Sequence, residues 1–580
     1  MKYRWLISPV QPGKSRVLAD ALGISALLAQ CLVNRGVDNT DGARRFLTPR
    51  LRDLCDPLLI PNMDRAVERL CIARTRREQL LIFGDYDVDG VTSTALLREV
   101  LQALGWIVDF YLPGRFGEGY GLSQLAAEKC LARCPATLLL AVDCGSTSVE
   151  TVQWLQGQGT DVIILDHHQI SDPPPAAVAL VNPLGNSHRA GPGVPSANPF
   201  TELSSVGLSF KLAHALVKRG RQEQWPEALQ FDLRPLLDLV ALGTVADLVP
   251  LKGENRILVR AGLNHLNAWK RTGLRALRKV ASIEGVAGCH EIGFQLAPRL
   301  NAAGRLEHAV EALDLLLAAD DQSASALAQS LDAKNRERQS IQREIAEEAI
   351  ASIRSQFQAE RDYVIVEGRD NWHIGIVGIV ASKVLQEFYR PTLILGREGE
   401  EWRGSGRSIE GFDLAEALRF CNQFLLRHGG HAMAAGLSMR PEEVHRFREA
   451  LNGYAREVLR PELLQPPLRL DSVVTPADLT LAMVAELNQL DPTGPGNPPV
   501  QLAMHGVTHQ RPPQRMGGQG QHAKFWAGHD GRGIEAVWWN CGEAPLPEMR
   551  FDLAFVPQIN VYNGNRTVQL KVLDWRPAFG

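Results

Sequence analysis

Residues 80–90 read LLIFGDYDVDG, an apolar run that ends in a glycine and three alternating aspartates. Residues 138–145 (LLLAVDCG) and 162–168 (VIILDHH) repeat the pattern of an apolar run followed by acidic or imidazole side chains. Apolar runs this short, alternating with helical stretches such as 93–104, are typical of buried parallel strands joined by crossover helices. The sequence therefore predicts an α/β domain with a parallel sheet, in which ligands bind at the carboxyl ends of the strands.

The side chains that follow these runs are expected to meet, because the carboxyl ends of parallel strands lie at one edge of the sheet. A further apolar run, 239–243, leads into Asp247 and is expected to end there as well. A lone Asp-x-Asp-Gly is more often a turn, and a lone pair of histidines is more often a packing feature. Several converging carboxylates, however, need cations to neutralise them. The combination predicts a metal site.

The ligand types at this site indicate which metal it binds. Mainly oxygen ligands with one or two imidazoles suit Mn²⁺ or Mg²⁺. Zinc is the alternative, but its usual thiolate ligands are missing apart from Cys144, which is expected to be a small packing residue. Two ions about 3.5–4 Å apart activate water and stabilise both oxygens of an in-line displacement at phosphorus. The predicted chemistry is phosphodiester hydrolysis with two Mn²⁺ or Mg²⁺ ions.

The bulk composition describes an ordinary globular chain. It has 580 residues, of which 45% are hydrophobic and 22% charged, and its net charge of -3 on its own favours a neutral metabolic enzyme over a nucleic-acid binder. Nine cysteines without a CxxC pair indicate reduced thiols. No apolar run reaches about 18 residues, and the N-terminus lacks the apolar core of a signal peptide. We expect a cytoplasmic protein without a membrane segment.

Changes in the sequence pattern along the chain predict its division into domains. A gap-free helical pattern without Gly or Pro covers 320–358, and short β-rich runs at 551–556 and 567–573 flank the turn signal Asn563-Gly564. We predict an N-terminal extension (1–50), a phosphoesterase domain (51–315), a connecting helix (316–358), a second, smaller α/β domain (359–460) and a small β-barrel domain (461–580).

The ordered set of acidic motifs resembles the DHH phosphoesterase superfamily. Three later motifs, PRLNAAGR (298–305), GSGRS (404–408) and GGHAMAAG (429–436), are similar to those of the RecJ-type 5′→3′ exonucleases. The resemblance covers residues 50 to 575 and implies a DHH domain, a DHH-associated domain and an OB-like barrel. It also implies a hydrolase that degrades single-stranded DNA from the 5′ end, releasing 5′-mononucleotides, in DNA repair and recombination.

The resemblance also implies roles for individual residues of the acidic cluster. The implied metal ligands, with the third bridging two ions, are Asp87, Asp89, Asp143, His167 and Asp247. His168 is placed beside them as a catalytic residue in contact with substrate or metal, and Asp85 and Asp166 as supports that orient water or a histidine. Phe83 stands where related phosphatases have a histidine, which leaves one metal site short of a side-chain ligand.

A terminal 5′-phosphate requires a cationic pocket near the metals, and arginine binds phosphate through two parallel hydrogen bonds. By resemblance, Arg299, Ser405 and Arg407 form this pocket with His431 close by, and Arg115 is a weaker candidate for a backbone contact. For an unplaced arginine a surface ion pair is the more common role. The glycines around Arg407 and His431 favour a ligand, because they allow the backbone to approach it closely.

Three functions remain in order of preference. The first is the single-stranded-DNA exonuclease. The second is a DHH phosphodiesterase acting on oligoribonucleotides or cyclic dinucleotides, which the length of the chain and its barrel disfavour. The third is a non-catalytic replication scaffold, which the retention of all five ligands disfavours. By resemblance we expect a monomer that works with single-stranded DNA, a single-strand-binding protein and a DNA helicase.

Overall fold

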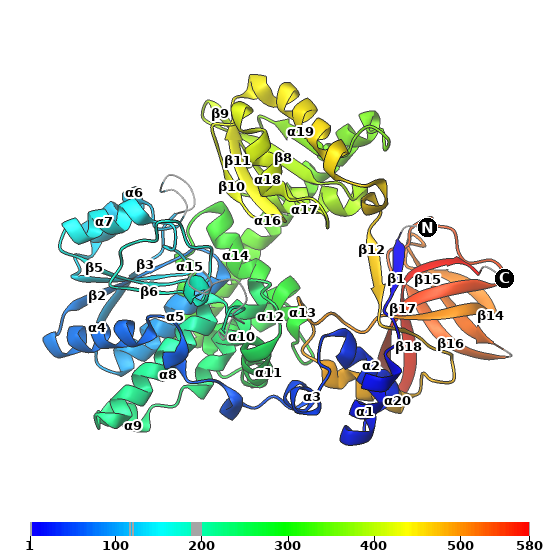
Figure 1. Cartoon of the computed structure of the whole chain (residues 1–580), viewed down its shortest axis with the longest axis horizontal. Coiled ribbons are helices and arrows are strands. Elements are labelled where there is room, and N and C mark those ends of the chain that lie inside the picture. Colours follow the sequence, from blue (N-terminus) through cyan, green and yellow to red (C-terminus); the bar gives the residue numbers. More distant parts are fainter. Residues whose placement is uncertain (1–2, 115–117, 119–120, 187–199, 530, 579–580) are drawn as a thin grey trace. The chain divides into compact units, whose positions relative to one another are not determined.

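The computed structural model describes residues 3–114, 118, 121–186, 200–529 and 531–578. The chain forms two compact units, and Figure 1 labels their helices and strands. The parallel-sheet unit comprises Arg35–Asn335 with Gln489–Pro499, and the mixed-sheet unit comprises Met1–Asn34, Arg336–Asn488 and Val500–Gly580. The long helix α16 (Asp321–Gln356) runs from the first unit into the second, and confirms the predicted helical segment.

The parallel-sheet unit contains five parallel strands in the order β3-β2-β4-β5-β6. The strands are β2 (Gln79–Gly84), β3 (Ile107–Tyr111), β4 (Leu138–Val142), β5 (Asp161–Leu165) and β6 (Ala179–Val181). The three apolar runs that precede the acidic motifs form the adjacent strands β2, β4 and β5, as predicted. The strand order reverses at β2, between β3 and β4, which is where open α/β sheets bind ligands.

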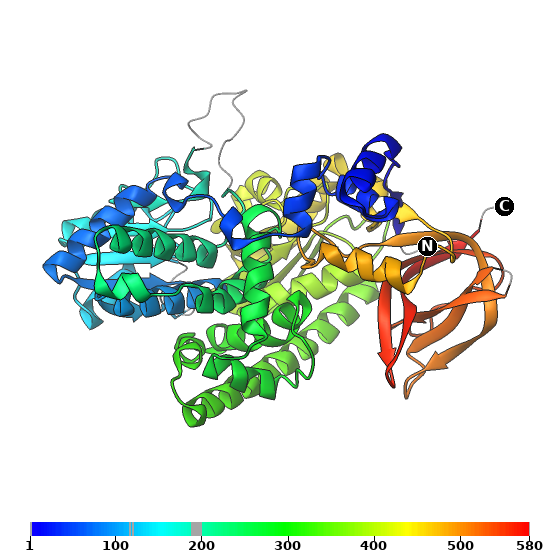
Figure 2. The same cartoon turned by 90° about the horizontal axis from the view of Figure 1, so that it is seen from below.

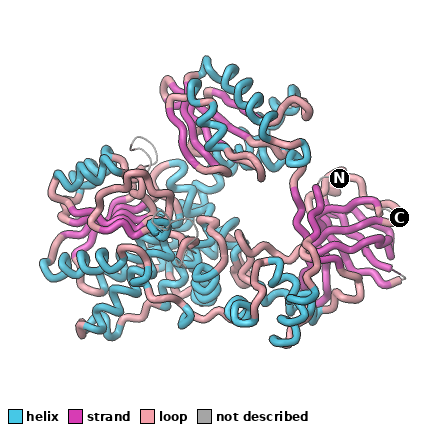
Figure 3. The backbone as a smooth tube through the Cα atoms, viewed as in Figure 1, coloured by secondary structure: helices cyan, strands magenta, loops and turns pink. Residues whose placement is uncertain are grey.

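Both faces of this sheet are buried, which explains the continuous apolar runs. Alternate residues such as Phe83 and Leu139 pack with α6 (Gln124–Arg133) and α7 (Val149–Gly157). Their neighbours Ile82 and Leu140 pack on the other side, against α4 (Met63–Arg76), α5 (Val88–Ala103) and α8 (Ser205–Gln222). Figure 3 shows these strands between layers of helix.

One predicted strand is wrong. Residues 239–243 belong to helix α10 (Leu237–Ala246), so Asp247 follows a helix and not a strand. The run is buried on every side, and a fully buried apolar segment has no periodicity that separates strand from helix.

The other helical elements of the unit are α3 (Thr40–Leu47), η1 (Leu51–Asp53), η2 (Pro57–Leu59), η3 (Pro183–Asn186), α9 (Pro226–Gln230), η4 (Arg234–Leu236), α11 (Gly253–Leu266), α12 (Thr272–Val280), α13 (Cys289–Glu291), the π-helix η5 (Ile292–Leu296), α14 (Ala297–Leu306) and α15 (Val310–Leu317).

The first part of the mixed-sheet unit is a five-stranded sheet in the order β10-β11-β9-β8-β7. Only β7 and β8 are parallel. The strands are β7 (Ile365–Arg369), β8 (Thr392–Glu398), β9 (Glu401–Arg407), β10 (Arg427–Gly430) and β11 (Ala434–Met439). The accompanying helices are α17 (Val377–Phe388), α18 (Leu414–Phe420), η6 (Asn422–Phe424), η7 (Pro441–Glu443), α19 (Val444–Val458) and η8 (Pro461–Leu464).

The second part is the predicted barrel, whose strands are orange and red in Figure 2. It is closed by pairing of β14 with β17. Its strands are β14 (Leu502–Met516), β15 (His522–His529), β16 (Arg532–Trp538), β17 (Phe551–Tyr562) and β18 (Asn565–Pro577), preceded by β12 (Pro467–Leu470), β13 (Ser472–Val473), α20 (Leu481–Leu487) and η9 (Asn488–Leu490). Asn563-Gly564 forms the β17–β18 turn with positive φ at both residues, as this dipeptide favours.

The N-terminal residues belong to the same unit as the barrel. Strand β1 (Arg4–Ile7) pairs in parallel with β12, and helices α1 (Pro12–Leu22) and α2 (Ala26–Asn34) follow. Among the described residues, no single helix has both the length and the apolar character to cross a bilayer; α1 and α2 meet both criteria only as a pair bent by 120°.

Candidate metal centre

Backbone hydrogen bonds fix the positions of three aspartates at the strand ends. The N–H groups of Asp85, Asp143 and Asp166 each continue the ladder to the neighbouring strand, donating to Val142 O (3.3 Å), Leu165 O (3.1 Å) and Val181 O (3.1 Å). Each aspartate is therefore held one residue beyond its strand, at the same edge of the sheet. All three side chains are buried.

The chain turns tightly between β2 and α5, which places two further aspartates at this edge. A Cβ on Gly90 would lie 2.5 Å from the carbonyl oxygen of Asp85, so only glycine fits there. The side chain of Asp87 caps α5, accepting hydrogen bonds from the N–H groups of Asp89 (2.9 Å) and Gly90 (3.2 Å). Asp89, in the first turn of α5, accepts hydrogen bonds from the N–H groups of two residues at the start of α8.

Asp166 orients the two histidines that follow it. Its Oδ1 accepts hydrogen bonds from the N–H groups of His167 (2.8 Å) and His168 (3.2 Å) and lies 2.8 Å from His168 Nδ1. Its Oδ2 accepts a hydrogen bond from Ser146 N–H (3.0 Å). All of its carboxylate contacts described here are thus to the backbone and to His168, which fits a supporting role.

The two histidines differ in charge at neutral pH. Burial opposes protonation of His168, but its hydrogen bond to Asp166 and the negative charge of Asp166 raise the pKa of His168 to about 9. Burial would raise the pKa of Asp166, but the same hydrogen bond and the positive charge of His168 hold it well below its usual range. Burial, and then the positive charge of His168, lower the pKa of His167 to about 4. His168 is therefore a cation, while His167 is a neutral imidazole with a free lone pair for a metal.

The acidic and imidazole atoms form three overlapping groups, each compact enough to hold an ion. The groups are Asp143–His167–His168, Asp89–His167–Asp247 and Asp85–Asp87–Asp143, with the ligand atoms of each group within 4.8 Å of one another. The Nε2 atom of His167 lies 3.5 Å from Asp143 Oδ1 and 3.5 Å from Asp247 Oδ2. Neither His167 Nε2 nor Asp247 Oδ2 has a hydrogen-bond partner among the described residues, although both are buried. Such atoms fit a cation.

The carboxylates repel one another in the absence of a cation. Burial, and then the charge of Asp87, raise the pKa of Asp89 to about 7. Burial, and then Asp89, raise the pKa of Asp247 to about 9, and the pKa of Asp143 is raised well above its ordinary value for the same reasons. Divalent cations would replace these protons. Burial also raises the pKa of the Cys144 thiol, so a zinc-binding thiolate is disfavoured and the oxygen-rich set suits Mn²⁺ or Mg²⁺.

The structure brings together all eight residues predicted for the acidic cluster, and it adds one detail about Asp85. This residue belongs to a donor group with Asp87 and Asp143, so its position suits a metal ligand as well as a support. Helix α14 also touches the cluster, which sequence reasoning missed: Asn301 Oδ1 accepts a hydrogen bond from Val88 N–H (3.1 Å). The signal was present in the PRLNAAGR motif, which we interpreted only for its arginine.

The residues predicted for the phosphate pocket are divided between the units. In the mixed-sheet unit, Ser405 and Arg407 lie on β9, and Arg407 Nη1 donates to Ser405 Oγ (3.0 Å). His431 lies in the β10–β11 turn, and its N–H donates to the carbonyl oxygen of Ala434 (2.8 Å), which is paired with Arg407 across the sheet. These three residues therefore share one end of the sheet.

The two remaining arginines of this prediction lie elsewhere. In the parallel-sheet unit, the guanidinium of Arg299 donates to Asp332 Oδ1 (2.9 Å) and to the carbonyl oxygen of Gln295 (2.6 Å). Arg299 is therefore held in an ion pair, but the pair is largely buried and is not the surface ion pair named as the common role of an arginine. Arg115 lies outside the described residues. Gly378, at the start of α17, was missed: a Cβ there would lie 3.0 Å from Ser405 Oγ and 3.3 Å from Arg407 Nη2, so a larger residue would crowd both side chains.

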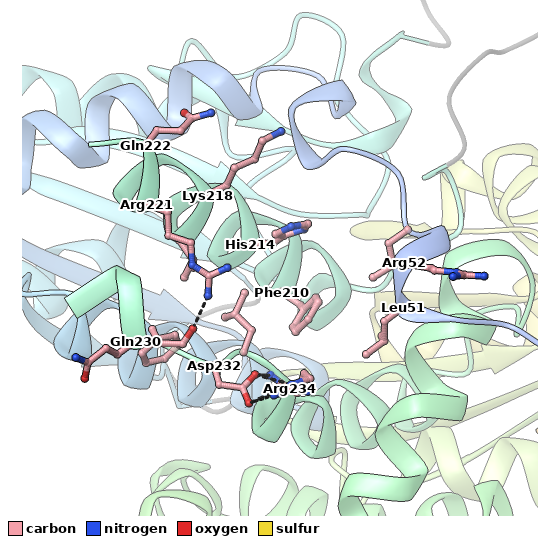
Figure 4. Close-up of a pocket in the computed structure, with 14 residues that line it drawn as sticks. Leu51, Arg52, Phe210, His214, Lys218, Arg221, Gln222, Gln230, Asp232 and Arg234 are labelled. Carbon is pink, nitrogen blue, oxygen red and sulfur yellow. Dashed lines mark hydrogen bonds and ion pairs between the residues drawn. The ribbon is translucent and has the colours of Figure 1, made fainter. Parts of the chain in front are cut away.

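A cavity of about 840 Å³ in the parallel-sheet unit is separate from the acidic cluster (Figure 4). Its lining includes Phe210, His214 and Lys218 of α8, and none of the acidic-cluster residues. Three of its cationic groups have protein partners: Lys218 pairs with Asp56 (2.5 Å), Arg234 pairs with Asp232 (2.8 Å), and Arg221 donates to the carbonyl oxygen of Phe231 (2.9 Å). The cavity lacks the donor set that the metal chemistry requires.

The fold and the acidic cluster define a DHH-type protein, and three family models match the chain in the expected order. These are the DHH family N-terminal domain (residues 79–244), the DHHA1 domain (361–457) and the RecJ OB domain (470–574). The chain belongs to the RecJ family of single-stranded-DNA-specific exonucleases.

The relatives support this assignment over nearly the full chain. The RecJ protein of Bacillus subtilis is 37% identical over 579 residues (99% of this chain, 71% of the relative), and that of Escherichia coli is 34% identical over 564 residues (94% of each). Among solved structures, RecJ of Thermus thermophilus in complex with Mn²⁺ has a TM-score of 0.84 at 29% identity, covering 100% of this chain and 80% of that one. The complex of the same protein with Mg²⁺ has a TM-score of 0.78 at 27% identity, covering 100% and 79%.

Proposed function

We propose that this chain is a single-stranded-DNA-specific exonuclease that works from the 5′ end, releases 5′-mononucleotides and acts in DNA repair and recombination. The observation that carries the proposal is the buried cluster of carboxylates and imidazoles at the end of β2, β4 and β5, in a member of the RecJ family. The RecJ OB domain at residues 470–574 supports a polymer substrate, because OB folds bind single strands by stacking bases and tracking the backbone.

The residues of the cluster divide the work. We assign Asp87, Asp89, Asp143, His167 and Asp247 to two Mn²⁺ or Mg²⁺ ions, with Asp143 shared between them and Asp85 beside it. Such ions, when bound, supply Lewis-acid activation of water and of the scissile phosphate. His168 lies beside the proposed metal ligands and is placed to contact the phosphate, and Asp166 orients it through the contact between Asp166 Oδ1 and His168 Nδ1 (2.8 Å).

We assign recognition of the terminal 5′-phosphate to Ser405, Arg407 and His431. Their grouping at one end of the mixed sheet supports this, as do the glycines around them. Arg299, predicted as a full member of the pocket, becomes a weaker candidate because it is paired with Asp332, and Arg115 remains one. The proposed partners of a chain acting on exposed single strands are a single-strand-binding protein and a DNA helicase, and the proposed working form is a monomer.

An end-label assay tests the function. Single- and double-stranded DNA of one sequence, labelled at either end, is incubated with the protein and Mn²⁺, Mg²⁺ or EDTA. The control variant is Asp143→Asn, because Asp143 has φ 63 and asparagine tolerates this left-handed backbone better than alanine. We expect metal-dependent release of mononucleotides from the 5′ end of the single strand only, reduced more than about a hundredfold in the variant. Degradation that persists in EDTA or in the variant would contradict the proposal. If short oligoribonucleotides or cyclic dinucleotides, supplied in parallel reactions, were cleaved and the DNA were not, the alternative would be favoured.

A further inference from the structure

The start of helix α8 contacts the metal cluster through consecutive residues that the sequence motifs do not include. Ser205 N–H donates to Asp89 Oδ2 (2.7 Å), and Val206 N–H donates to Asp89 Oδ1 (2.9 Å). The side-chain hydroxyl of Ser205 donates to Asp143 Oδ1 (2.9 Å). The first N–H groups of a helix lack partners within the helix, so this carboxylate satisfies two of them.

Ser205 therefore touches a carboxylate in each of the three donor groups. Asp143 belongs to the Asp143–His167–His168 and Asp85–Asp87–Asp143 groups, and Asp89 belongs to the third. Ser205 and Asp143 are buried, so the hydrogen bond between them forms away from bulk solvent. A hydroxyl bound to one oxygen of Asp143 fixes the rotation of this carboxylate, which is the member shared by two groups.

The elements that carry Ser205 leave it little freedom to move. Ser204 caps α8, and its hydroxyl lies 3.0 Å from the Thr244 hydroxyl of α10. A Cβ on Gly243 of α10 would lie 2.3 Å from Thr92 Oγ1 of α5 and 2.8 Å from Val206 Cγ1 of α8. Helices α5, α8 and α10 are therefore in close contact around Asp89, and hold the Ser205 hydroxyl at a fixed position.

We propose that Ser205 is a positioning residue for the metal centre: its hydroxyl orients Asp143, and its N–H group orients Asp89, for binding of divalent cations. The inference rests on the proposed use of this cluster as a metal site. Residues that orient metal ligands without touching the metal typically affect metal affinity by about 10- to 100-fold. Removal of the hydroxyl leaves the N–H contact with Asp89 intact, so we expect metal affinity to fall about tenfold, at the lower end of this range.

The test compares Ser205→Ala with Ser209→Ala in the full chain. Ser209 lies one turn further along α8, is equally buried, and its hydroxyl has no hydrogen-bond partner among the described residues. Mn²⁺ binding is measured without DNA by electron paramagnetic resonance of the free ion, and the melting temperature of each variant is measured in EDTA. The Mn²⁺ concentration for half-maximal nuclease activity is then compared with the rate at saturating Mn²⁺.

We expect Ser205→Ala to weaken Mn²⁺ binding about tenfold and to raise the Mn²⁺ concentration for half-maximal activity, with a smaller change in the saturated rate. Ser209→Ala should bind Mn²⁺ like the parent. Equal Mn²⁺ affinity of Ser205→Ala and the parent would overturn the proposal, as would equal weakening by both variants. Because the binding measurement contains no DNA, it stands even if the parent degrades another substrate than the one proposed.

Discussion

His167 Nε2 and Asp247 Oδ2 lie 3.5 Å apart, both buried and both without a hydrogen-bond partner among the described residues. One follows strand β5 and the other follows helix α10, so the fold brings them together from distant parts of the sequence. Leaving two buried polar atoms unsatisfied costs about 1–3 kcal/mol each. A cation between them would remove that cost.

The stability of the metal-free protein should fall as the pH rises from 7 to 9. In the folded state the pKa values of Asp89, Asp247 and His168 are about 7, 9 and 9, each above its ordinary value. A raised pKa in the folded state stabilises the protein while the proton is bound, and this contribution is lost as the pH rises through the folded value. The melting temperature in EDTA should therefore decrease over this interval.

Mn²⁺ should counteract this loss of stability at high pH. Cations compete with protons for the same ligands, so Mn²⁺ affinity rises with pH, and the gap between the melting temperatures in Mn²⁺ and in EDTA should widen from pH 7 to 9. A constant gap would show that the raised pKa values do not belong to the metal ligands.

Asp247→Asn should stabilise the metal-free protein at pH 9 while it weakens metal binding. The substitution removes a buried charge that is repelled by Asp89. Asp238→Asn is the matched control, because buried Asp238 pairs with Arg271 (2.9 Å), and its loss leaves the arginine with one carboxylate partner fewer. Relative to the parent, the melting temperature of Asp247→Asn should be higher in EDTA and lower in Mn²⁺. The control should lower both, and a fall for Asp247→Asn in EDTA would oppose the account.

Gly90→Ala should destabilise the fold by more than about 3 kcal/mol and abolish Mn²⁺ binding. The added Cβ would lie 2.5 to 2.8 Å from three backbone atoms of Asp85, so the loop that carries the aspartates has to move. Gly157→Ala, where a Cβ meets nothing within 4 Å, should be neutral or slightly stabilising. Urea unfolding measures both, and a Gly90→Ala protein as stable as the parent would be inconsistent with this loop geometry.

Arg407→Gln should reduce the preference for 5′-phosphorylated over 5′-hydroxyl ends by about 10- to 100-fold, the value of a hydrogen bond to a charged group. Its metal site should be unaffected, since all the proposed metal ligands lie in the parallel-sheet unit. Arg427→Gln is the control, an arginine of the same sheet that pairs with Glu401 (3.0 Å) at the surface. Initial rates on the two substrates give the ratio, and an unchanged ratio in Arg407→Gln would remove Arg407 from the phosphate site.

The local sequence pattern correctly predicted the parts of the fold in which the hydrophobic periodicity and the turn residues indicate the same structure. The strand 138–142 and the turn at Asn563-Gly564 match the structure, because an apolar run between turn signals and an Asn-Gly pair each favour one conformation. The predicted strand at 239–243 does not match the structure, because a segment buried on all sides has no periodicity that separates a strand from a helix. The pairing of β1 with β12 was also missed, since contacts between distant segments leave no local signal.

The same division applies to the metal centre. Its acidic residues were predictable because each follows an apolar run in the sequence. The run is a strand in every case except that of Asp247, which follows helix α10. The contacts of Ser205 with Asp143 and of Arg299 with Asp332 were not, because a hydrogen bond between elements far apart in sequence depends on packing. Ordinary residue types such as serine carry no pattern of their own.

Anomalous diffraction from crystals grown with Mn²⁺ tests the central claim most directly. The account predicts two strong peaks about 3.5–4 Å apart, both within coordination distance of Asp143, with His167 and Asp247 at one of them. The absence of peaks at this edge of the sheet, or peaks bound by other residues, would contradict it.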